Sequence, residues 1–301
     1  MKILVPVDGS SFSKSAVNFV ASRTTLIQHQ PEVELLNVQY PISARVWRAA
    51  GKDLVDSYQV SEANKVLKPC LATLKRAGLI ARAKYVVGSP GSAVGAIAAE
   101  DAADLIVMGS HGHTGFRSVL LGSVTHSVLA SCTTPLLVLR DSAVPKKDSL
   151  RIGIALDGSK YGVAAARFVA KQRDLFGLAP KVTLLHVVPD LLNLVVPGYF
   201  GGRPLRVAEP EQVEAMQRAA FEQAVAVPKK LLEAAGLQVN EVRLVGNSPG
   251  DEIATYVKKN KLDILALGSH GRDALKAVTL GSVSTRVAAR CRLPLLLIRG
   301  A

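Results

Sequence analysis

The stretch "GSHGHTGFRSVLLGS" at residues 109–123 returns near the other end of the chain as "GSHGRDALKAVTLGS" at residues 268–282. Eight of the fifteen positions are identical, and both stretches keep the spacing glycine, two residues, glycine, nine residues, glycine-serine. An internal repeat of this length predicts a chain that contains two copies of one structural unit.

The repeat continues on both sides of these stretches. "KILVPVDGS" at 2–10 matches "RIGIALDGS" at 151–159, and "CTTPLLVLR" at 132–140 matches "CRLPLLLIR" at 291–299. The chain has 301 residues, which is enough for two domains that each bury a core of their own.

These matches set the expected domain boundaries. We expect one domain at 1–141, a polar linker at 142–149 and a second domain at 150–301. The distance between matching residues grows from 149 at the first aspartates, Asp8 and Asp157, to 159 at the late glycines, so the second domain carries about ten extra residues. We place them near 191–206, as a surface loop or a lid.

Each unit alternates short apolar runs with longer stretches of helical periodicity. In the first unit we expect strands near 2–7, 33–39, 80–87, 104–108 and 135–139, and helices at 12–28, 55–77, 91–102 and 122–132. Nearly continuous apolar strands are typical of parallel sheets with helices on both faces. The pattern predicts an α/β fold made of two tandem, doubly wound, five-stranded domains.

Composition narrows the functional classes. Apolar runs stay well below the roughly 18 residues of a membrane span, and the N-terminus lacks a signal-peptide core, so we expect a cytoplasmic protein. The cysteines Cys70, Cys132 and Cys291 form no CxxC pair, which favours reduced thiols. The net charge of +13 is dispersed and lacks interleaved aromatic residues, which argues against a nucleic-acid partner.

The repeated polar residues fall where a parallel sheet binds ligands. Such sheets bind ligands beyond the carboxyl ends of their strands, where the strand order reverses. Asp8 and Asp157 follow the first strand of each unit, and Gly109 and Gly268 end the fourth. If the first and fourth strands are neighbours, an aspartate and a glycine loop share one crevice in each unit.

The glycine spacing suggests a phosphate site. Gly109 and Gly112 lack β-carbons, so the backbone there can bend sharply and approach a ligand. Gly122 and Ser123 begin a predicted helix, where unpaired N–H groups and the helix dipole attract negative charge. The same reasoning applies to the second copy.

The neighbouring residues suggest what else the ligand carries. A carboxylate such as Asp8 can accept hydrogen bonds from ribose hydroxyls or an adenine amino group. Val38 with Met108, or Val187 with Leu267, would flank a purine ring. The alternative for the aspartates is that they only cap the following helices.

These motifs resemble the universal stress protein family in its tandem, nucleotide-binding form. The family's ATP motif, G-x2-G-x9-G-[ST], is present in both copies, and the resemblance extends to the "DGS" after each first strand. It implies the strand order 3-2-1-4-5, a layout like that of adenine-nucleotide hydrolases. It also implies binding of ATP, ADP or AMP, with Mg²⁺ accompanying ATP.

The resemblance further implies that domains pair through their last strands. In this chain the pairing would join 136–139 to 295–298 as a pseudo-dimer, and a homodimer of chains is a further option. The candidate nucleotide-binding residues are Pro6, Val7, Asp8, Val38, Met108, Gly109, His111, Gly112, Gly122, Ser123, Val124 and Thr125 in the first unit, and Leu156, Asp157, Val187, Leu267, Gly268, His270, Gly271, Gly281, Ser282, Val283 and Ser284 in the second.

The sequence offers a binding site without an evident catalytic set. No Walker lysine follows the glycine loop and no G-x-S-x-G elbow is present, so we assign no catalytic residue. The His111–His113 pair is not repeated, because Arg272 replaces the second histidine, which argues against a metal. The favoured function is a nucleotide-binding regulator of stress survival. The alternatives are a slow ATPase or self-phosphorylating enzyme that uses Asp8 and Ser123, and a ligand-free interaction scaffold.

The two copies differ in detail. Gly115 of the first loop corresponds to Ala274, and the serine-rich "SSFSKSA" after the first aspartate corresponds to "SKYGVAA" in the second unit. The second loop therefore has less backbone freedom and fewer hydroxyl groups. We expect both sites to bind nucleotide, with the first site favoured.

Overall fold

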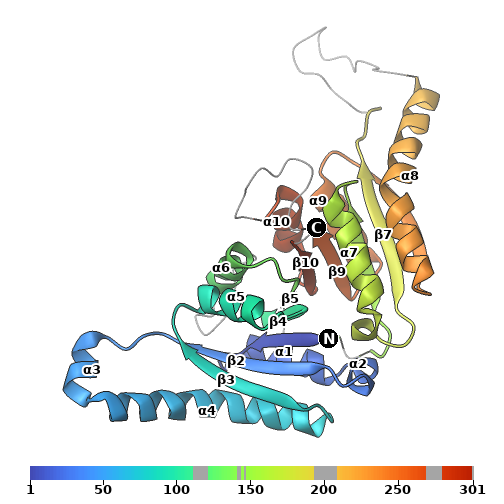
Figure 1. Cartoon of the computed structure of the whole chain (residues 1–301). Helices are drawn as coiled ribbons and strands as arrows, with labels where there is room; N and C mark the ends of the chain where they lie inside the picture. The colour runs from blue at the N-terminus through green and yellow to red at the C-terminus, as the bar shows by residue number, and fades with distance from the viewer. Residues whose placement is uncertain (111–120, 141–143, 146, 193–208, 269–279, 300–301) are drawn as a thin grey trace, which may run out of the picture.

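The fold is taken from a computed structural model of the whole chain, which describes residues 1–110, 121–140, 144–145, 147–192, 209–268 and 280–299. Ten strands form one sheet in the order β3-β2-β1-β4-β5-β10-β9-β6-β7-β8 (Figure 1). The extra residues expected near 191–206 lie almost entirely outside the described residues.

The first half contains five strands and six helices among its described residues. The strands are β1 (Lys2–Pro6), β2 (Glu32–Gln39), β3 (Ala81–Val87), β4 (Leu105–Gly109) and β5 (Leu136–Leu139). The helices are α1 (Ser11–Ala21), α2 (Thr24–Gln28), α3 (Ala44–Ala50), α4 (Lys52–Arg76), α5 (Pro90–Glu100) and α6 (Ser123–Ser131).

The second half repeats this order. Its strands are β6 (Arg151–Leu156), β7 (Lys181–Val188), β8 (Gln238–Val245), β9 (Ile264–Gly268) and β10 (Leu295–Ile298). Its helices are α7 (Lys160–Lys171), the short 3-10 helix η1 (Arg173–Phe176), α8 (Pro210–Ala234), α9 (Pro249–Lys259) and α10 (Ser282–Arg290).

The strand order within each half confirms the predicted doubly wound fold. In both halves the first strand lies between the second and the fourth, and all pairs within a half are parallel. β1 pairs with β2 through Val5 and Leu35, and with β4 through Ile3 and Leu105. The order is 3-2-1-4-5, so the strand order reverses beside β1 and beside β6.

Alternate residues of the strands enter two different cores. Ile3 and Val5 belong to a core that includes residues of α1, α4, α7 and α8 on one face, whereas Leu4 belongs to a core that includes residues of α5, α6, α9 and α10 on the other. This is the side-chain alternation of a β-strand, in a sheet covered on both faces. Each core contains residues from both halves, so the two halves share their packing.

The two halves meet at an antiparallel pair of strands. β5 and β10 pair through Leu136 with Leu297 and through Val138 with Leu295. Beyond the paired strands, the Arg140 guanidinium donates to the Cys291 carbonyl, and the Arg299 guanidinium donates to the Cys132 carbonyl at 3.3 Å. The two arginines occupy the same repeat position, so the contacts are reciprocal, as in a two-fold interface.

One predicted helix is wrong in its extent. Residues 12–28 do not form a single helix, because α1 ends at Ala21 and α2 begins at Thr24. At the break, the Ser22 hydroxyl donates to the Phe19 carbonyl at 2.8 Å. The buried Arg23 guanidinium donates to the Pro145 carbonyl in the linker at 2.7 Å. The break between α1 and α2 thus combines a local contact with one to a residue 122 positions away.

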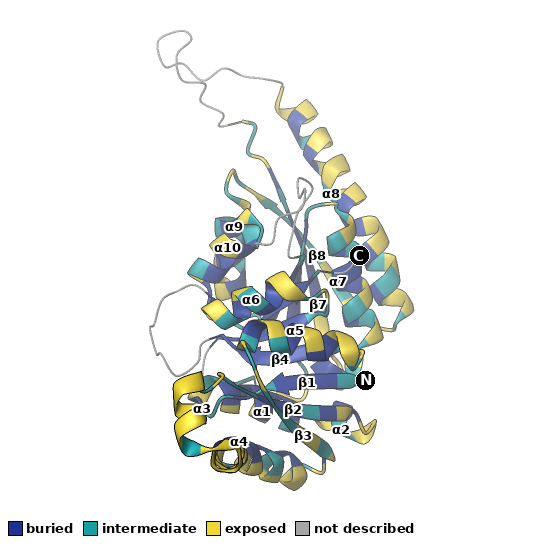
Figure 2. Cartoon of the chain, turned by 60° about the vertical axis from the view of Figure 1, so that its left-hand side comes forward, coloured by how far each residue is buried: buried dark blue, intermediate teal, exposed yellow. Residues whose placement is uncertain are grey.

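Helix α3 is not predicted by the sequence analysis. It has no buried residue, and Val46 and Trp47 on it are substantially exposed (Figure 2). A helix without a buried face lacks the apolar periodicity that the prediction uses. None of the described helices is long and apolar enough to cross a membrane.

The reciprocal arginine contacts generate a stability prediction. Arg140 is buried, so Arg140→Met should lower the free energy of unfolding by about 1–3 kcal/mol, because the Cys291 carbonyl loses this donor. Arg299→Met should cost less, since its bond is longer and its side chain is only half-buried. Urea unfolding followed by circular dichroism measures both. Equal losses, or none, would contradict the assigned role of Arg140.

Candidate functional site

A cavity of about 1050 Å³ opens at the carboxyl ends of β1, β2 and β4 in the first half. Ten of the candidate residues of the first unit line it: Pro6, Val7, Asp8, Val38, Met108, Gly109, Gly122, Ser123, Val124 and Thr125. The remaining two, His111 and Gly112, lie outside the described residues. The fold therefore brings together residues that are more than a hundred positions apart in the sequence.

Asp8 lies in a tight turn after β1. Its Oδ1 accepts a hydrogen bond from the Ser10 backbone N–H at 3.0 Å, and Gly9 between them has a φ of 87°, a value that favours glycine. Helix α1 is capped by Ser10, whose hydroxyl accepts from the Ser13 N–H at 3.2 Å. Asp8 is thus not the cap residue of α1, which removes the alternative considered for it.

Gly109 ends β4 at a point of very close packing. A β-carbon there would lie 2.6 Å from Cβ and 2.7 Å from the carbonyl carbon of Phe12. The missing side chain therefore allows the first turn of α1 to lie against the end of β4. Close approach of a ligand is the reason that the sequence suggests for this glycine, and the structure adds a packing reason.

Helix α6 begins at the cavity. Gly122 is its N-cap, and the Gly122 N–H donates to the Ser110 carbonyl at 2.8 Å. No side-chain hydrogen bond caps α6 in the part of the chain that the structure describes, and its first turn carries no acidic residue. The N–H groups of this first turn can therefore receive an anion, favoured by the helix dipole.

Two predicted ligand hydroxyls have partners within the fold. The buried Thr125 hydroxyl lies 3.5 Å from the Ser110 carbonyl, and the buried Ser284 hydroxyl donates to the Gly268 carbonyl at 3.0 Å. Both link the first turn of a helix to the end of the preceding strand. We therefore assign them the positioning of α6 and α10.

The second half has the same strand-end geometry. Asp157 accepts from the Ser159 N–H at 3.0 Å across Gly158, whose φ is 79°. The other described candidates lie at the matching ends of β6, β7 and β9 and at the start of α10: Leu156, Val187, Leu267, Gly268, Gly281, Ser282, Val283 and Ser284. His270 and Gly271 lie outside the described residues.

A polar position on the second strand of each half was missed by the sequence analysis. The Asn37 amide donates to the Val7 carbonyl at 2.8 Å, and His186 Nδ1 lies 2.8 Å from the Leu156 carbonyl. Both side chains are buried and hold the end of the first strand. The signal was a polar residue at the same position, the fifth, of the repeated runs "VELLNVQ" and "VTLLHVV".

The same position makes the two halves differ in bulk. His186 is larger than Asn37, and its ring lies 6.4 Å from the ring of Phe221 on α8. Helices α4 and α8 each have 25 residues, and the position that matches Phe221 in α4 is Ala63. Two rings in the second half thus correspond to two small side chains in the first.

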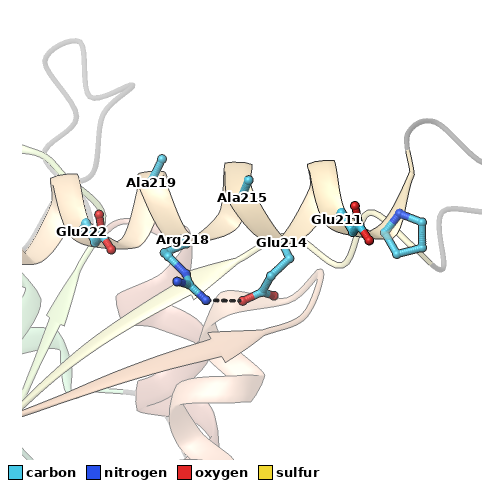
Figure 3. Close-up of a pocket in the computed structure, with 7 residues that line it drawn as sticks. Glu211, Glu214, Ala215, Arg218, Ala219 and Glu222 are labelled. Carbon is cyan, nitrogen blue, oxygen red and sulfur yellow. Dashed lines mark ion pairs between the residues drawn. The ribbon is translucent and has the colours of Figure 1, made fainter.

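A second hollow lies on the outer face of α8 (Figure 3). It is lined by residues of this one helix, with Ala215 and Ala219 between charged side chains. Arg218 lies 3.7 Å from Glu214, and the guanidinium of Arg243 holds the pKa of Glu214 below its ordinary value. None of the candidate residues lies there, and two of its four charged residues, Glu214 and Arg218, form an ion pair with each other.

Comparison with known proteins identifies the family. The family model described as "Universal stress protein family" matches residues 1–140 and again residues 149–299. The chain belongs to this family. The two matches cover nearly the whole chain and correspond to the two halves of the sheet.

Several relatives match along nearly the whole chain. A universal stress protein from Mycolicibacterium smegmatis is 25% identical over 99% of this chain and 96% of its own length. A universal stress protein structure from Archaeoglobus fulgidus covers 99% of this chain and 98% of its own, with a TM-score of 0.69 and 22% identity. A half-length universal stress protein crystallised with cAMP is 26% identical over 48% of this chain and 98% of its own, with a TM-score of 0.36.

The packing of Gly109 generates a second prediction. Gly109→Ala should lower the free energy of unfolding by about 1–3 kcal/mol, because the added methyl group meets Phe12. Gly88→Ala is the matched control, since a β-carbon there meets only the Ala93 methyl group at 3.9 Å. Thermal or urea unfolding without any ligand measures both variants. A Gly109→Ala protein as stable as Gly88→Ala would show that packing does not require this glycine.

Proposed function

We propose that the first-half cavity binds an adenine nucleotide, namely ATP, ADP or AMP, and that the protein acts in the cytoplasm as a regulatory stress-survival factor controlled by this nucleotide. One observation carries the proposal. A single cavity is bounded by the Asp8 turn, by the apolar side chains of Val38 and Met108, and by the uncapped start of α6. These features suit the ribose, the purine and the phosphates respectively.

The phosphates supply the strongest physical argument. Gly122 and Ser123 present the first turn of α6 to the cavity, and N–H groups at a helix start attract phosphate oxygens. Lys14 also lines the cavity and adds a positive charge. Among the described residues no three His, Cys, Asp or Glu side chains cluster as metal ligands, so we assign Mg²⁺ to the phosphates of ATP.

The part of the cavity proposed for the purine has an apolar side chain on each of two sides. Met108 is buried at the end of β4, and Val38 is half-buried near the end of β2. An adenine ring between them would remove apolar surface from water, at about 25 cal/mol per Å². Asp8, held by its turn, can accept from a ribose hydroxyl or from the adenine amino group.

The two halves act as an intramolecular dimer in this proposal, with units 1–141 and 150–301. The reciprocal contacts of Arg140 and Arg299 and the pairing of β5 with β10 support it. We propose the first half as the principal site. In the second half, His186 and Phe221 occupy space that the smaller Asn37 and Ala63 leave open in the first. A homodimer of whole chains stays a prediction from the resemblance.

Regulation requires that the nucleotide prefer one conformation. A ligand shifts an equilibrium only through its different affinities for the two states. The cavity is bounded by the ends of separate elements, the β1–α1 turn, the end of β4 and the start of α6. A nucleotide that contacts all three would stabilise the arrangement in which they are close.

The test begins with the purified protein. Denaturation should release about one adenine nucleotide per chain if the first site alone is occupied, and about two if both expected sites are, identified by chromatography. Asp8→Ala should weaken ATP binding at least tenfold by calorimetry, because the carboxylate loses its hydrogen bonds to the ligand. The matched variant Asp157→Ala, in the same turn of the second half, should leave this affinity within about twofold.

Three results would change the conclusion. No released nucleotide, together with no thermal stabilisation by added ATP, would reject the nucleotide proposal and favour a ligand-free scaffold. A larger loss in Asp157→Ala than in Asp8→Ala would move the principal site to the second half. Accumulation of ADP in proportion to protein, abolished by Asp8→Asn, would favour the slow ATPase.

A further inference from the structure

The first-half cavity continues beyond the strand ends as a groove between α1 and α4. On α4 its lining runs as one helical stripe from Tyr58 through Glu62 and Val66 to Thr73. These residues span about 22 Å of helix at 1.5 Å per residue. Since β3 begins at Ala81, soon after α4 ends, the groove leads away from the nucleotide cleft toward the amino ends of the strands (Figure 1).

The floor of this groove is apolar. Val17 of α1 and Cys70 of α4 are buried, and Val66 is half-buried beside them. Burial raises the pKa of the Cys70 thiol, so the sulfur stays protonated and uncharged near neutral pH. A chain of methylene groups that lies over this floor would remove its apolar surface from water, which favours binding.

The rim of the groove carries one cation that is not ion-paired. Lys14 is exposed on α1, and it has no ion-pair partner among the residues that the structure describes. The other lysine of the lining, Lys65, is paired with Glu62 on its own helix. An anionic group above the floor would therefore meet Lys14.

The second half lacks these features at the matching positions. Val163 stands in α7 where α1 has Lys14. The cation is therefore replaced by an apolar side chain. The groove chemistry is thus specific to the first half and is not a general consequence of the repeat.

We infer that the α1–α4 groove is a second ligand site, which binds an amphipathic monocarboxylate of the medium-chain fatty-acid type. The alkyl chain lies over Val17 and Val66, and the carboxylate pairs with the Lys14 ammonium. The site is contiguous with the nucleotide cleft and shares Lys14 with it, whereas its floor comes from α1 and α4. A carboxylate at Lys14 would stand close to a bound nucleotide, so the two ligands would influence each other's affinity.

The experiment uses the full chain without nucleotide, titrated with dodecanoate below its micelle concentration in a calorimeter. Binding should saturate at one molecule per chain. Decanoate, with two fewer methylene groups, should bind about 15-fold more weakly if both groups are buried. Dodecanol, which has no charge for Lys14, should also bind more weakly than dodecanoate.

Charge variants locate the site. Lys14→Glu should weaken dodecanoate binding at least tenfold, and Lys14→Arg should restore most of it. The matched control is Lys68→Glu, an exposed lysine of α4 that does not line the cavity and undergoes the same change of charge. Thermal unfolding of each variant shows whether the fold is intact.

The outcomes separate this inference from the nucleotide proposal. Dodecanoate binding that persists in Asp8→Ala while ATP binding is lost would support two distinct sites. Dodecanoate binding by a chain that binds no nucleotide would support the groove and reject the proposed function. Absence of saturable binding at one per chain, or an equal loss in Lys68→Glu, would overturn the inference.

Discussion

The parallel pairing of β1 with β4 is the constraint on which the site depends. β2 lies on the opposite side of β1, so the strand order reverses there and the connections after β1 and β4 diverge to opposite faces. The register, with Ile3 opposite Leu105, brings the Asp8 turn and Gly109 together at the carboxyl ends of these two strands. The proposed nucleotide contacts all depend on this meeting of the two strand ends.

The junction of β5 and β10 explains why the two copies of the site can differ. The antiparallel pairing, the reciprocal arginine contacts and the shared cores keep both halves in one sheet. Each half is then stabilised partly by the other. The second half can therefore carry His186 and Phe221 beside its strand ends, and the first half can keep an open cavity, within the same architecture.

Local motifs made part of this structure predictable from sequence. The "DGS" turns and the glycine spacing identified the strand ends and the start of α6, because turn and cap residues act over a few positions. The strand order came from the family resemblance. The break between α1 and α2 was missed because it depends on Arg23 meeting Pro145 across the fold. The α1–α4 groove was missed because helix packing, with no local motif, places Val17 beside Val66.

The central claim is that the strand-end cavity of the first half holds the adenine nucleotide. Photolabelling with 8-azido-ATP, followed by mapping of the labelled peptides, tests this claim most directly. The account predicts labelling of peptides that contain Val38 or Met108, which excess ATP suppresses. Labelling confined to the α8 face at 210–222, or labelling that excess ATP does not reduce, would contradict it.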